Sequence, residues 1–505
     1  MKKKIYSLEE LEKKIKTIRK NSKIVLCHGV FDVIHSGHIE YFKEAKSLGD
    51  ILIVTLTTDG FVNKGSNRPF YGIQQRLNVV SALSFVDYVA ESKDISALNV
   101  LSKLKPNFYI KGKDYNNLND DISGKIFKEK KIVEKYGGEL IITKSKLHSS
   151  SKFINEKYAN FNKLQKIYLN KLRINFDEKK IHEYFSKIEK SEILLIGETI
   201  IDEYIYSNVL GKAGKDPILT IKPNSKVVYL GGILSMAKIL STFCKKVKVI
   251  TYLGEKKEYL DFINKNLEKN ISIKYIAKKN SPTIKKTRYV DNDGKSKIIG
   301  IYKINDSLLD RHEEKKIDKI LQTELKKVKN VIVADYGHGL LTKKLINTIQ
   351  KKSNKLAINT QLNSANFGFH TISKYHKANI VCVHEGEIRQ DLRSPDKNIE
   401  ELAIELSKKI SSKNIFITQG SKGAMSYNKV EGVLNCPAFS NKVIDKVGAG
   451  DSFLSIASIC SFVGMPNNLC LLVGNLFGSI AVSSIGNSAK FEKSMIINTI
   501  KTMLK

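Results

Sequence analysis

Two histidines three residues apart are the first residues in this chain that could do chemistry. His35 and His38 lie in CHGVFDVIHSGHIEYFKEAKSLGD, residues 27–50, directly after an apolar stretch. We expect a strand to end near His28 and, after a tight loop, a helix to begin near His38. Free amides at a helix start attract phosphate, and two imidazoles beside them can stabilise charge on an attacked α-phosphorus. A lone H-x-x-H is also compatible with surface or capping residues, so the flanking residues decide.

A second phosphate motif lies near the other end of the chain, in NKVIDKVGAGDSFLS, residues 441–455. Here Gly448, Ala449 and Gly450 lead into Asp451 and then into an apolar helical run. A glycine-rich turn at a helix start presents backbone amides as an anion hole. An aspartate there can take a proton from a hydroxyl nucleophile while the amides stabilise the transferring phosphoryl group. A G-x-G turn alone would also fit an ordinary helix entry.

The elements that must position these groups alternate between strand and helix, which predicts parallel α/β layers. Apolar strands at residues 23–31 and 191–204 mark two separate beginnings, and 505 residues exceed what one core usually holds. We therefore predict two domains, residues 1–160 and 191–505, joined by a Lys-rich helical linker at 161–190.

The net charge of the chain raises the question of a nucleic-acid partner. The chain has 85 Lys+Arg and 51 Asp+Glu, a formal net charge of +34. This charge leaves nucleic-acid binding as an alternative, but nearly all the basic residues are scattered lysines, so we expect no nucleic-acid partner.

Cysteine usage and apolar runs bear on where the protein works. The six cysteines form no C-x-x-C pair, which argues against a disulfide framework or a zinc site. The N-terminal stretch has no apolar segment typical of a signal peptide, and no apolar run is long enough to span a membrane. We predict a cytoplasmic protein with no membrane partner.

The residues around the two histidines resemble a known signature. The pattern G-x-F-D-x-x-H-x-G-H is similar to that of the Rossmann-like nucleotidyltransferase family that includes glycerol-phosphate cytidylyltransferase and the heptose-phosphate adenylyltransferases. The resemblance continues, in the expected order, through NKGSNRP (63–69), QQRL (74–77), IKGKDY (110–115) and LHSSSKFI (147–154).

This resemblance implies specific roles in the first domain. His35 and His38 would contact a nucleoside triphosphate and stabilise the pentacoordinate transition state. Asp32 and Asp114 could equally be structural cap or turn residues. The implied nucleotide- and phosphate-binding residues are Gly29, Phe31, Asp32, Lys64, Arg76, Asp114, Ser149 and Ser150.

The second motif, D-x-x-G-A-G-D-S-F, resembles the ribokinase-like sugar kinases. Further segments agree in order: IGETIIDEY (196–204), YLGGILSMA (229–237), PTIKKTR (282–288), VADYGHG (333–339) and ITQGSKGAM (417–425). The resemblance implies a ribokinase-like α/β domain with a small lid, and Asp451 as the catalytic base. It implies nucleotide or phosphate contacts at Thr418, Gly420, Gly423, Gly448, Ala449 and Gly450, substrate contacts at Asp202, Gly231, Gly232, Lys286 and Arg288, and a metal contact at Glu387.

The sequence departs from the kinase pattern at four places. Ser235 and His384 stand where the family has Asn, and Lys446 stands where it usually has Thr. Asn359-Thr360-Gln361 stands where relatives often have Asp-Pro-Lys. Because Asp451 and its glycine turn are intact, we favour a working kinase with a shifted substrate. The alternative is an active nucleotidyltransferase whose kinase fold serves ligand sensing or oligomerisation.

Together the two halves resemble the bifunctional heptose-phosphate kinase and adenylyltransferase, with the domain order inverted. The resemblance implies phosphorylation of a sugar or sugar phosphate by ATP at C1, then nucleotidyl transfer to the sugar 1-phosphate with release of pyrophosphate. Both ATP and CTP stay open as nucleotidyl donors. Mg²⁺ is expected in both reactions, and a homodimer through the kinase domain is implied by resemblance. Such an enzyme would serve nucleotide-sugar synthesis, for example for lipopolysaccharide.

Overall fold

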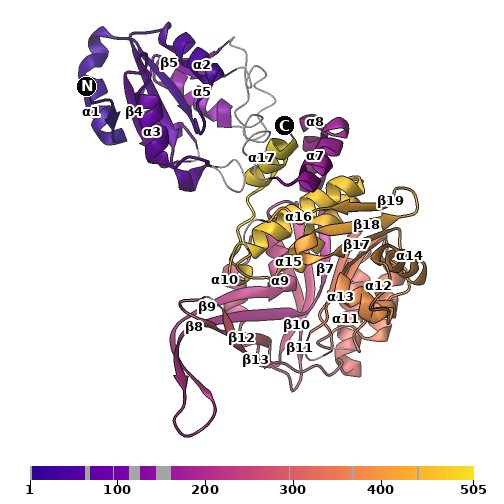
Figure 1. The fold of residues 1–505 in the computed structure, drawn as a ribbon. Helices are drawn as coiled ribbons and strands as arrows, with labels where there is room; N and C mark the ends of the chain where they lie inside the picture. Colours follow the sequence, from indigo (N-terminus) through magenta and orange to yellow (C-terminus); the bar gives the residue numbers. More distant parts are fainter. Residues whose placement is uncertain are drawn as a thin grey trace. The chain divides into compact units, whose positions relative to one another are not determined.

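The computed structural model in Figure 1 describes residues 3–504 except 63–68, 95, 113–124, 144–160, 295, 364–365, 367–368 and 441–442. The chain divides into two compact units. Unit 1 comprises Met1–Phe161 and Ser494–Lys505, and unit 2 comprises Asn162–Lys493. The predicted α/β fold with parallel sheets is confirmed in both units.

Unit 1 is built on a six-stranded parallel sheet of order β1-β4-β3-β2-β5-β6. Strand β2 pairs with β3 on one side and β5 on the other, so the strand order reverses at β2. Ligands of such sheets bind beyond the carboxyl ends of the strands at this switch point. The strands are β1 (Ile5–Tyr6), β2 (Ile24–Gly29), β3 (Ile51–Thr57), β4 (Tyr88–Ser92), β5 (Phe108–Lys111) and β6 (Glu139–Ile142).

Helices cover both faces of this sheet, and each face has its own apolar core. One core includes residues of α2 (Ser36–Lys46) and α3 (Ile73–Ser81). The other includes residues of α1 (Leu8–Ile18), α4 (Leu98–Leu104) and α5 (Lys125–Lys135). Strands β2 and β3 are apolar along most of their length because both of their faces are buried. Helix α17 (Lys493–Leu504) belongs almost entirely to unit 1.

Unit 2 contains a nine-stranded sheet of order β11-β10-β7-β14-β15-β16-β17-β18-β19. Its pairings are parallel except for β17–β18 and β18–β19. The strands are β7 (Glu192–Gly197), β10 (Lys246–Gly254), β11 (Ile271–Lys278), β14 (Asn330–Asp335), β15 (Lys355–Thr360), β16 (Ile380–His384), β17 (Asn414–Thr418), β18 (Ala424–Asn428) and β19 (Gly432–Cys436).

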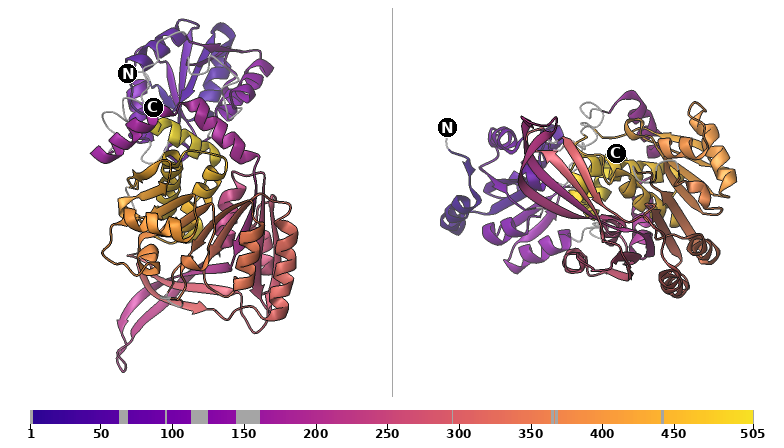
Figure 2. Two further views of the ribbon diagram at one scale, coloured as in Figure 1. Left: turned by 90° about the vertical axis from the view of Figure 1, so that its right-hand side faces the viewer. Right: turned by 90° about the horizontal axis from the view of Figure 1, so that it is seen from below.

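A second, four-stranded sheet in unit 2 has the order β13-β12-β8-β9. Figure 2 shows the hairpin of β8 and β9 reaching away from the nine-stranded sheet, as a lid element would. The strands are β8 (Thr199–Lys212), β9 (Leu219–Gly232), β12 (Ile284–Asp291) and β13 (Lys297–Lys303).

Helices flank both faces of the large sheet in unit 2 (Figure 1). The segment predicted as a helical linker, residues 161–190, contains α7 and α8, and both helices belong to unit 2. The predicted domain borders stay a prediction. In the described part of the chain, no helix is long and apolar enough to cross a bilayer. The helices are α7 (Lys163–Asn175), α8 (Glu178–Glu189), α9 (Ile233–Ser241), α10 (Leu260–Asn266), α11 (Arg311–Glu324), α12 (Lys343–Lys352), α13 (Glu385–Asp391), α14 (Ile399–Lys409), α15 (Ala449–Phe462) and α16 (Asn467–Val482).

Candidate active sites

The histidine pair of unit 1 lies at the switch point of the sheet. Strand β2 ends at Gly29 and α2 begins at Ser36, close to the predicted boundaries. The carbonyl of His35 accepts a hydrogen bond from the backbone N–H of His38 at 2.9 Å. The two rings are half-buried and stack with 4.0 Å between centroids and 25° between planes. Two imidazoles are therefore held side by side at a helix start.

The ring of Phe31 packs against His38 and fixes its position. The φ of Phe31, 47°, is uncommon for a bulky residue and marks a strained backbone. Its ring packs edge-on against His38, with 5.5 Å between centroids, and against Phe42 at 4.9 Å. A Cβ on Gly29 would lie 3.0 Å from the Phe31 ring. Gly29 and Phe31 thus support the histidines by packing.

Asp32 ties the loop after β2 to a distant part of the chain. Its buried carboxylate accepts from the N–H of Phe70 at 2.7 Å and of Tyr71 at 3.0 Å. Of the two roles left open for Asp32, these contacts support the structural one.

Arg76, which the resemblance assigns to phosphate, holds the same loop in place. The side chain is 1% exposed, and four of its five N–H groups donate to protein oxygens. Arg76 therefore positions the loop, and its role toward phosphate stays a prediction. The acceptors are the carbonyls of Val30 (2.6 Å), Tyr71 (2.9 Å) and Thr57 (2.9 Å) and the carboxylate of Asp59 (2.6 Å).

Sequence reasoning missed a polar group beside this site. His28 Nδ1 lies 2.9 Å from Thr55 Oγ1, and burial together with the charge of Lys111 lowers the pKa of His28 to about 4. Lys111 in turn pairs with buried Glu129 at 3.1 Å. Lys111 ends a strand within IKGKDY, which is the one signal that could have found it. The predicted residues Lys64, Asp114, Ser149 and Ser150 lie outside the described residues.

The glycine turn of unit 2 has the geometry expected of an anion hole. Gly448 precedes α15 with φ of 81°, and a Cβ there would lie 2.6 Å from Asn487 Oδ1. Both conformation and space therefore require glycine. Ala449, Gly450 and Asp451 form the first turn of α15, where the N–H groups have no acceptor within the helix.

Asp451 has the properties of a general base. Burial raises the pKa of its carboxyl group to about 7, and the negative charges of Asp202 and Glu387 act in the same direction. A hydrogen bond from Tyr336 and the charge of Lys286 oppose this rise. A carboxylate with a pKa near neutrality accepts a proton more readily than an ordinary one.

The substrate residues predicted for the kinase converge on Asp202. Asp202 on β8 is opposite Lys286 on β12 in the sheet register. Its carboxylate pairs with Arg288 and accepts from Asn487 Nδ2 at 3.0 Å. A Cβ on Gly231 would lie 2.1 Å from Asp202 Oδ2, which explains the glycine. Gly232 follows with φ of 53° and starts α9.

Lys286 is a buried ammonium at this end of the site. It is 8% exposed, and no hydrogen bond or ion pair joins its side chain to another described residue. Burial therefore lowers its pKa, while the charges of Asp202 and Asp451 oppose that change. Its ammonium lies over the ring of Tyr302, 5.6 Å from the centroid, and its role toward the substrate stays a prediction.

The residues predicted for the nucleotide lie at the carboxyl ends of β16 and β17. Thr418 pairs with His384 in register. Gly420 and Gly423 have φ of 58° and 105°, and a Cβ on Gly423 would lie 2.1 Å from the carbonyl of Cys436. Both glycines are therefore needed for the turn between β17 and β18.

Glu387, the predicted metal contact, caps α13. Its carboxylate accepts from the N–H groups of His384 at 2.7 Å and Leu362 at 3.1 Å, and burial raises its pKa. Among the residues that the structure describes, no group of three or more His, Cys, Asp or Glu side chains could hold a metal. The carboxylate of Glu387 is the type of oxygen ligand that Mg²⁺ binds, and Mg²⁺ commonly takes one or two carboxylates together with substrate phosphates.

Two of the residues that depart from the kinase pattern have local structural roles. Ser235 Oγ donates to the carbonyl of Gly232 at 2.9 Å, and His384 Nδ1 accepts from the N–H of Gly386 at 3.0 Å. Lys446 is exposed.

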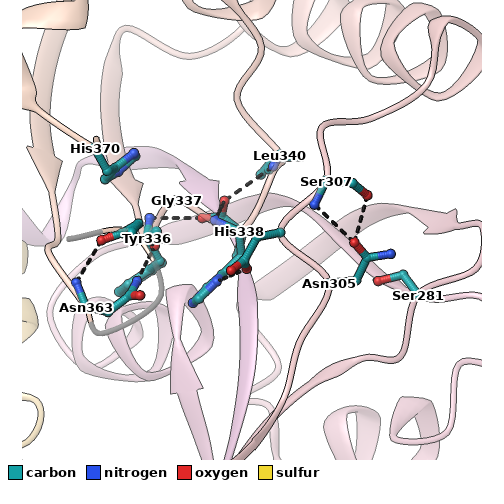
Figure 3. Close-up of polar contacts among 12 residues, drawn as sticks. Ser281, Asn305, Ser307, Tyr336, Gly337, His338, Leu340, Asn363 and His370 are labelled. Atoms are coloured by element: carbon teal, nitrogen blue, oxygen red, sulfur yellow. Dashed lines mark hydrogen bonds and ion pairs between the residues drawn. The ribbon is translucent and has the colours of Figure 1, made fainter. Parts of the chain in front are cut away.

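Glu198 is a second residue that sequence reasoning missed. Fully buried at the end of β7, it accepts from the N–H groups of Tyr336 (3.1 Å), His338 (3.1 Å) and Leu340 (3.3 Å). Figure 3 shows these three residues along one loop. Since Tyr336 contacts Asp451, Glu198 positions the base through this loop. A glutamate inside the apolar stretch LLIGETII was the available signal.

Comparisons with known proteins assign each of the two regions to a family. Residues 26–157 match the cytidylyltransferase-like family, and residues 190–494 match the pfkB family carbohydrate kinases. The "Bifunctional protein HldE" of Campylobacter concisus is 38% identical over 133 residues, which are 26% of this chain and 28% of that protein. Its namesake in Helicobacter pylori strain G27 is 41% identical over 128 residues, 25% of this chain and 27% of that protein. The match thus spans less than a third of each relative.

Solved structures were also found. Phosphofructokinase-2 from Escherichia coli is 13% identical with a TM-score of 0.48, covering 61% of this chain and 97% of that one. Ribokinase from Thermotoga maritima is 20% identical with a TM-score of 0.46, covering 60% and 98%. Because one family model matches more than half of the residues, the chain belongs to the pfkB family of carbohydrate kinases, preceded by a cytidylyltransferase-like region.

Proposed function

We propose that this chain catalyses two successive steps of nucleotide-sugar synthesis. Unit 2 phosphorylates a sugar or sugar phosphate at the anomeric hydroxyl with ATP. Unit 1 then transfers a nucleotidyl group from ATP or CTP to the resulting sugar 1-phosphate and releases pyrophosphate. The order of the two regions, opposite to that of the bifunctional enzymes it resembles, is part of this proposal, as are a heptose-like substrate and a role in lipopolysaccharide synthesis.

The observation that carries the kinase half is Asp451, with its pKa raised to about 7, on the first turn of α15 after a glycine turn. The acceptor hydroxyl gives its proton to Asp451, and its oxygen attacks the γ-phosphorus of ATP as ADP leaves. The amides of the turn stabilise the transferring phosphoryl group. Asp202, held by Arg288, orients the sugar.

The nucleotidyltransferase half depends on the stacked imidazoles of His35 and His38 at the start of α2. A phosphate oxygen of the sugar 1-phosphate attacks the α-phosphorus of the nucleotide, and the bond to pyrophosphate breaks. The imidazoles donate to the developing negative charge. Bound Mg²⁺ would supply neutralisation of phosphate charge in both reactions, and Glu387 is the carboxylate that would hold it in unit 2.

The test uses the full chain with ATP or CTP, Mg²⁺ and a panel of sugars and sugar phosphates. ADP and pyrophosphate are measured separately, and products are identified by mass spectrometry. Asp451→Asn should abolish ADP formation and leave pyrophosphate release from a supplied sugar 1-phosphate intact, whereas His38→Ala should do the reverse. Loss of both activities in either variant, or their retention, would refute the assignment.

A second candidate function follows from Ser235, His384 and Lys446. In it the kinase fold binds a sugar ligand or joins two copies of the chain, and only unit 1 is catalytic. Tight sugar binding without ADP formation on any acceptor would favour it.

The first proposal also includes a cytoplasmic location and a homodimer formed through unit 2. Cell fractionation tests the location, and light scattering tests the dimer.

A further inference from the structure

A buried histidine beside the kinase site lacks one of its hydrogen-bond partners. His338 lies on the loop after β14, and its residue is 1% exposed. Its Nδ1 lies 2.7 Å from the carboxylate of Asp306, whereas its Nε2 is buried and has no partner among the described residues. Buried polar atoms are paired with few exceptions, and an unpaired one indicates a ligand or an ordered water.

The backbone around His338 is held rigidly. Its N–H donates to Glu198 at 3.1 Å, and its carbonyl accepts from Tyr252 at 2.7 Å and from buried Lys278 at 3.3 Å. Lys278 also donates to the carbonyls of Asn305 and Ser307, which flank Asp306. Figure 3 shows Asn305 and Ser307 on the segment beside the His338 loop. The His338 ring and the Asp306 carboxylate are thus positioned by segments that Lys278 joins.

The pairing with Asp306 decides what Nε2 can do. A carboxylate accepts only, so Nδ1 carries the proton, and Nε2 of the neutral ring presents a lone pair. The ring stays neutral at physiological pH because burial and the positive charge of Lys286 lower its pKa, although Asp306 opposes this. The lone pair at Nε2 can accept a hydrogen bond from a hydroxyl group. Because Nε2 carries no proton, it cannot donate a hydrogen bond to a phosphate oxygen.

The charge of Lys286 connects His338 with the substrate residues predicted for the kinase site. Lys286, whose charge acts on His338, also acts on Asp451 and lies opposite Asp202 in the sheet. One electrostatic cluster therefore contains His338 and the residues proposed to hold the acceptor.

From this geometry we propose that His338, oriented by Asp306, accepts a hydrogen bond from one hydroxyl of the acceptor sugar other than the hydroxyl that is phosphorylated. This inference rests on the proposed kinase function and deepens it. His338 is then a specificity-determining residue that selects acceptors with a hydroxyl at that place. A site built to bond a hydroxyl discriminates strongly against analogues that lack it, because its own polar atom is left unpaired.

The experiment compares the full chain with His338→Ala and His338→Gln on the best acceptor of the sugar panel and on its monodeoxy analogues. In the unaltered protein one deoxy position should raise KM by about tenfold or more. His338→Ala should raise KM for the parent sugar by a similar factor and should no longer discriminate at that one position. His338→Gln, whose amide oxygen can accept, should restore part of the discrimination. His376→Ala, an exposed histidine in the same unit, is the matched control.

Each outcome is decisive. If the unaltered protein forms no ADP with any acceptor, the proposed function itself fails, and sugar binding measured by calorimetry on the same variants then tests the His338 contact alone. If turnover occurs but the variants discriminate among the deoxy sugars as the unaltered protein does, Nε2 holds only a water and the inference is wrong. If circular dichroism shows that His338→Ala does not fold, discrimination among the deoxy sugars is compared between His338→Gln and the unaltered protein.

Discussion

Replacing Asp451 by Asn should remove phosphoryl transfer and at the same time stabilise unit 2 at alkaline pH. The carboxyl group has a pKa raised from 3.8 to about 7, mainly by burial. Asn has nearly the same shape and no charge to bury. Loss of a general base costs about 10²- to 10⁴-fold in kcat, so ADP formation should fall by that factor while stability rises.

The sign follows from proton linkage. Between pH 3.8 and about 7 the unfolded chain has released the proton of Asp451, while the folded chain still holds it. The native state is therefore penalised increasingly as pH rises through this window, and the penalty is constant above it. A pKa raised from 3.8 to about 7 corresponds to about 4 kcal/mol. Because Asp451 keeps partial exposure, we expect the measured gain to be smaller.

The assay is thermal unfolding of the full chain at about pH 4.5 and pH 8, with ADP formation measured in parallel. The advantage of Asp451→Asn should grow between these values and level off above about pH 7. In the unaltered protein, kcat for ADP formation should rise with pH and reach a plateau above about pH 7. Asp396→Asn, an exposed position, should change neither quantity. A variant that is less stable at pH 8 than the unaltered protein, or that retains kcat, would refute the reasoning.

Three further perturbations test the supporting contacts. Asp32→Ala leaves two backbone N–H groups without their acceptor and should lower the stability of unit 1 by about 1–3 kcal/mol in denaturant unfolding. Arg76→Lys keeps the charge but loses the four-way contact, so pyrophosphate release and stability should both fall, the latter by about 2 kcal/mol. Lys297→Met removes the ammonium 2.5 Å from buried Asp445, next to the glycine turn, and should slow ADP formation about tenfold while pyrophosphate release is unchanged. An unchanged rate of ADP formation would show that Lys297 does not hold the turn.

The sequence predicted those parts of the molecule whose signals are local. Buried parallel strands read as continuous apolar runs, so β2 was found within two residues of its bounds. The single strand predicted at 191–204 is in fact two, β7 and the start of β8, because Glu198 separates them within one apolar run. The start of α15 follows a glycine that needs a positive φ, and such a turn can be read from the letters alone.

What the sequence could not predict depends on contacts between distant residues. Arg76 reaches acceptors up to 46 positions away, and Glu198 accepts from amides about 140 positions further along the chain. Spacing and residue type give no information about such partners, so the sequence could not show that Arg76 holds its loop in place. His28 was missed because its neutral state follows from burial and from Lys111 on another strand.

Both sites use the same physical device to keep their reactive groups in place. In unit 1 the buried carboxylate of Asp32 accepts amides from residues 70 and 71, and in unit 2 the buried carboxylate of Glu198 accepts amides from residues 336, 338 and 340. A carboxylate offers several lone pairs to one loop without adding a donor that needs its own partner. Each loop is thereby fixed before substrate arrives, so the groups that it carries do not need to be ordered in the transition state. This explains why a buried acidic residue follows each of the apolar strands β2 and β7, where burying a charge would otherwise be unfavourable.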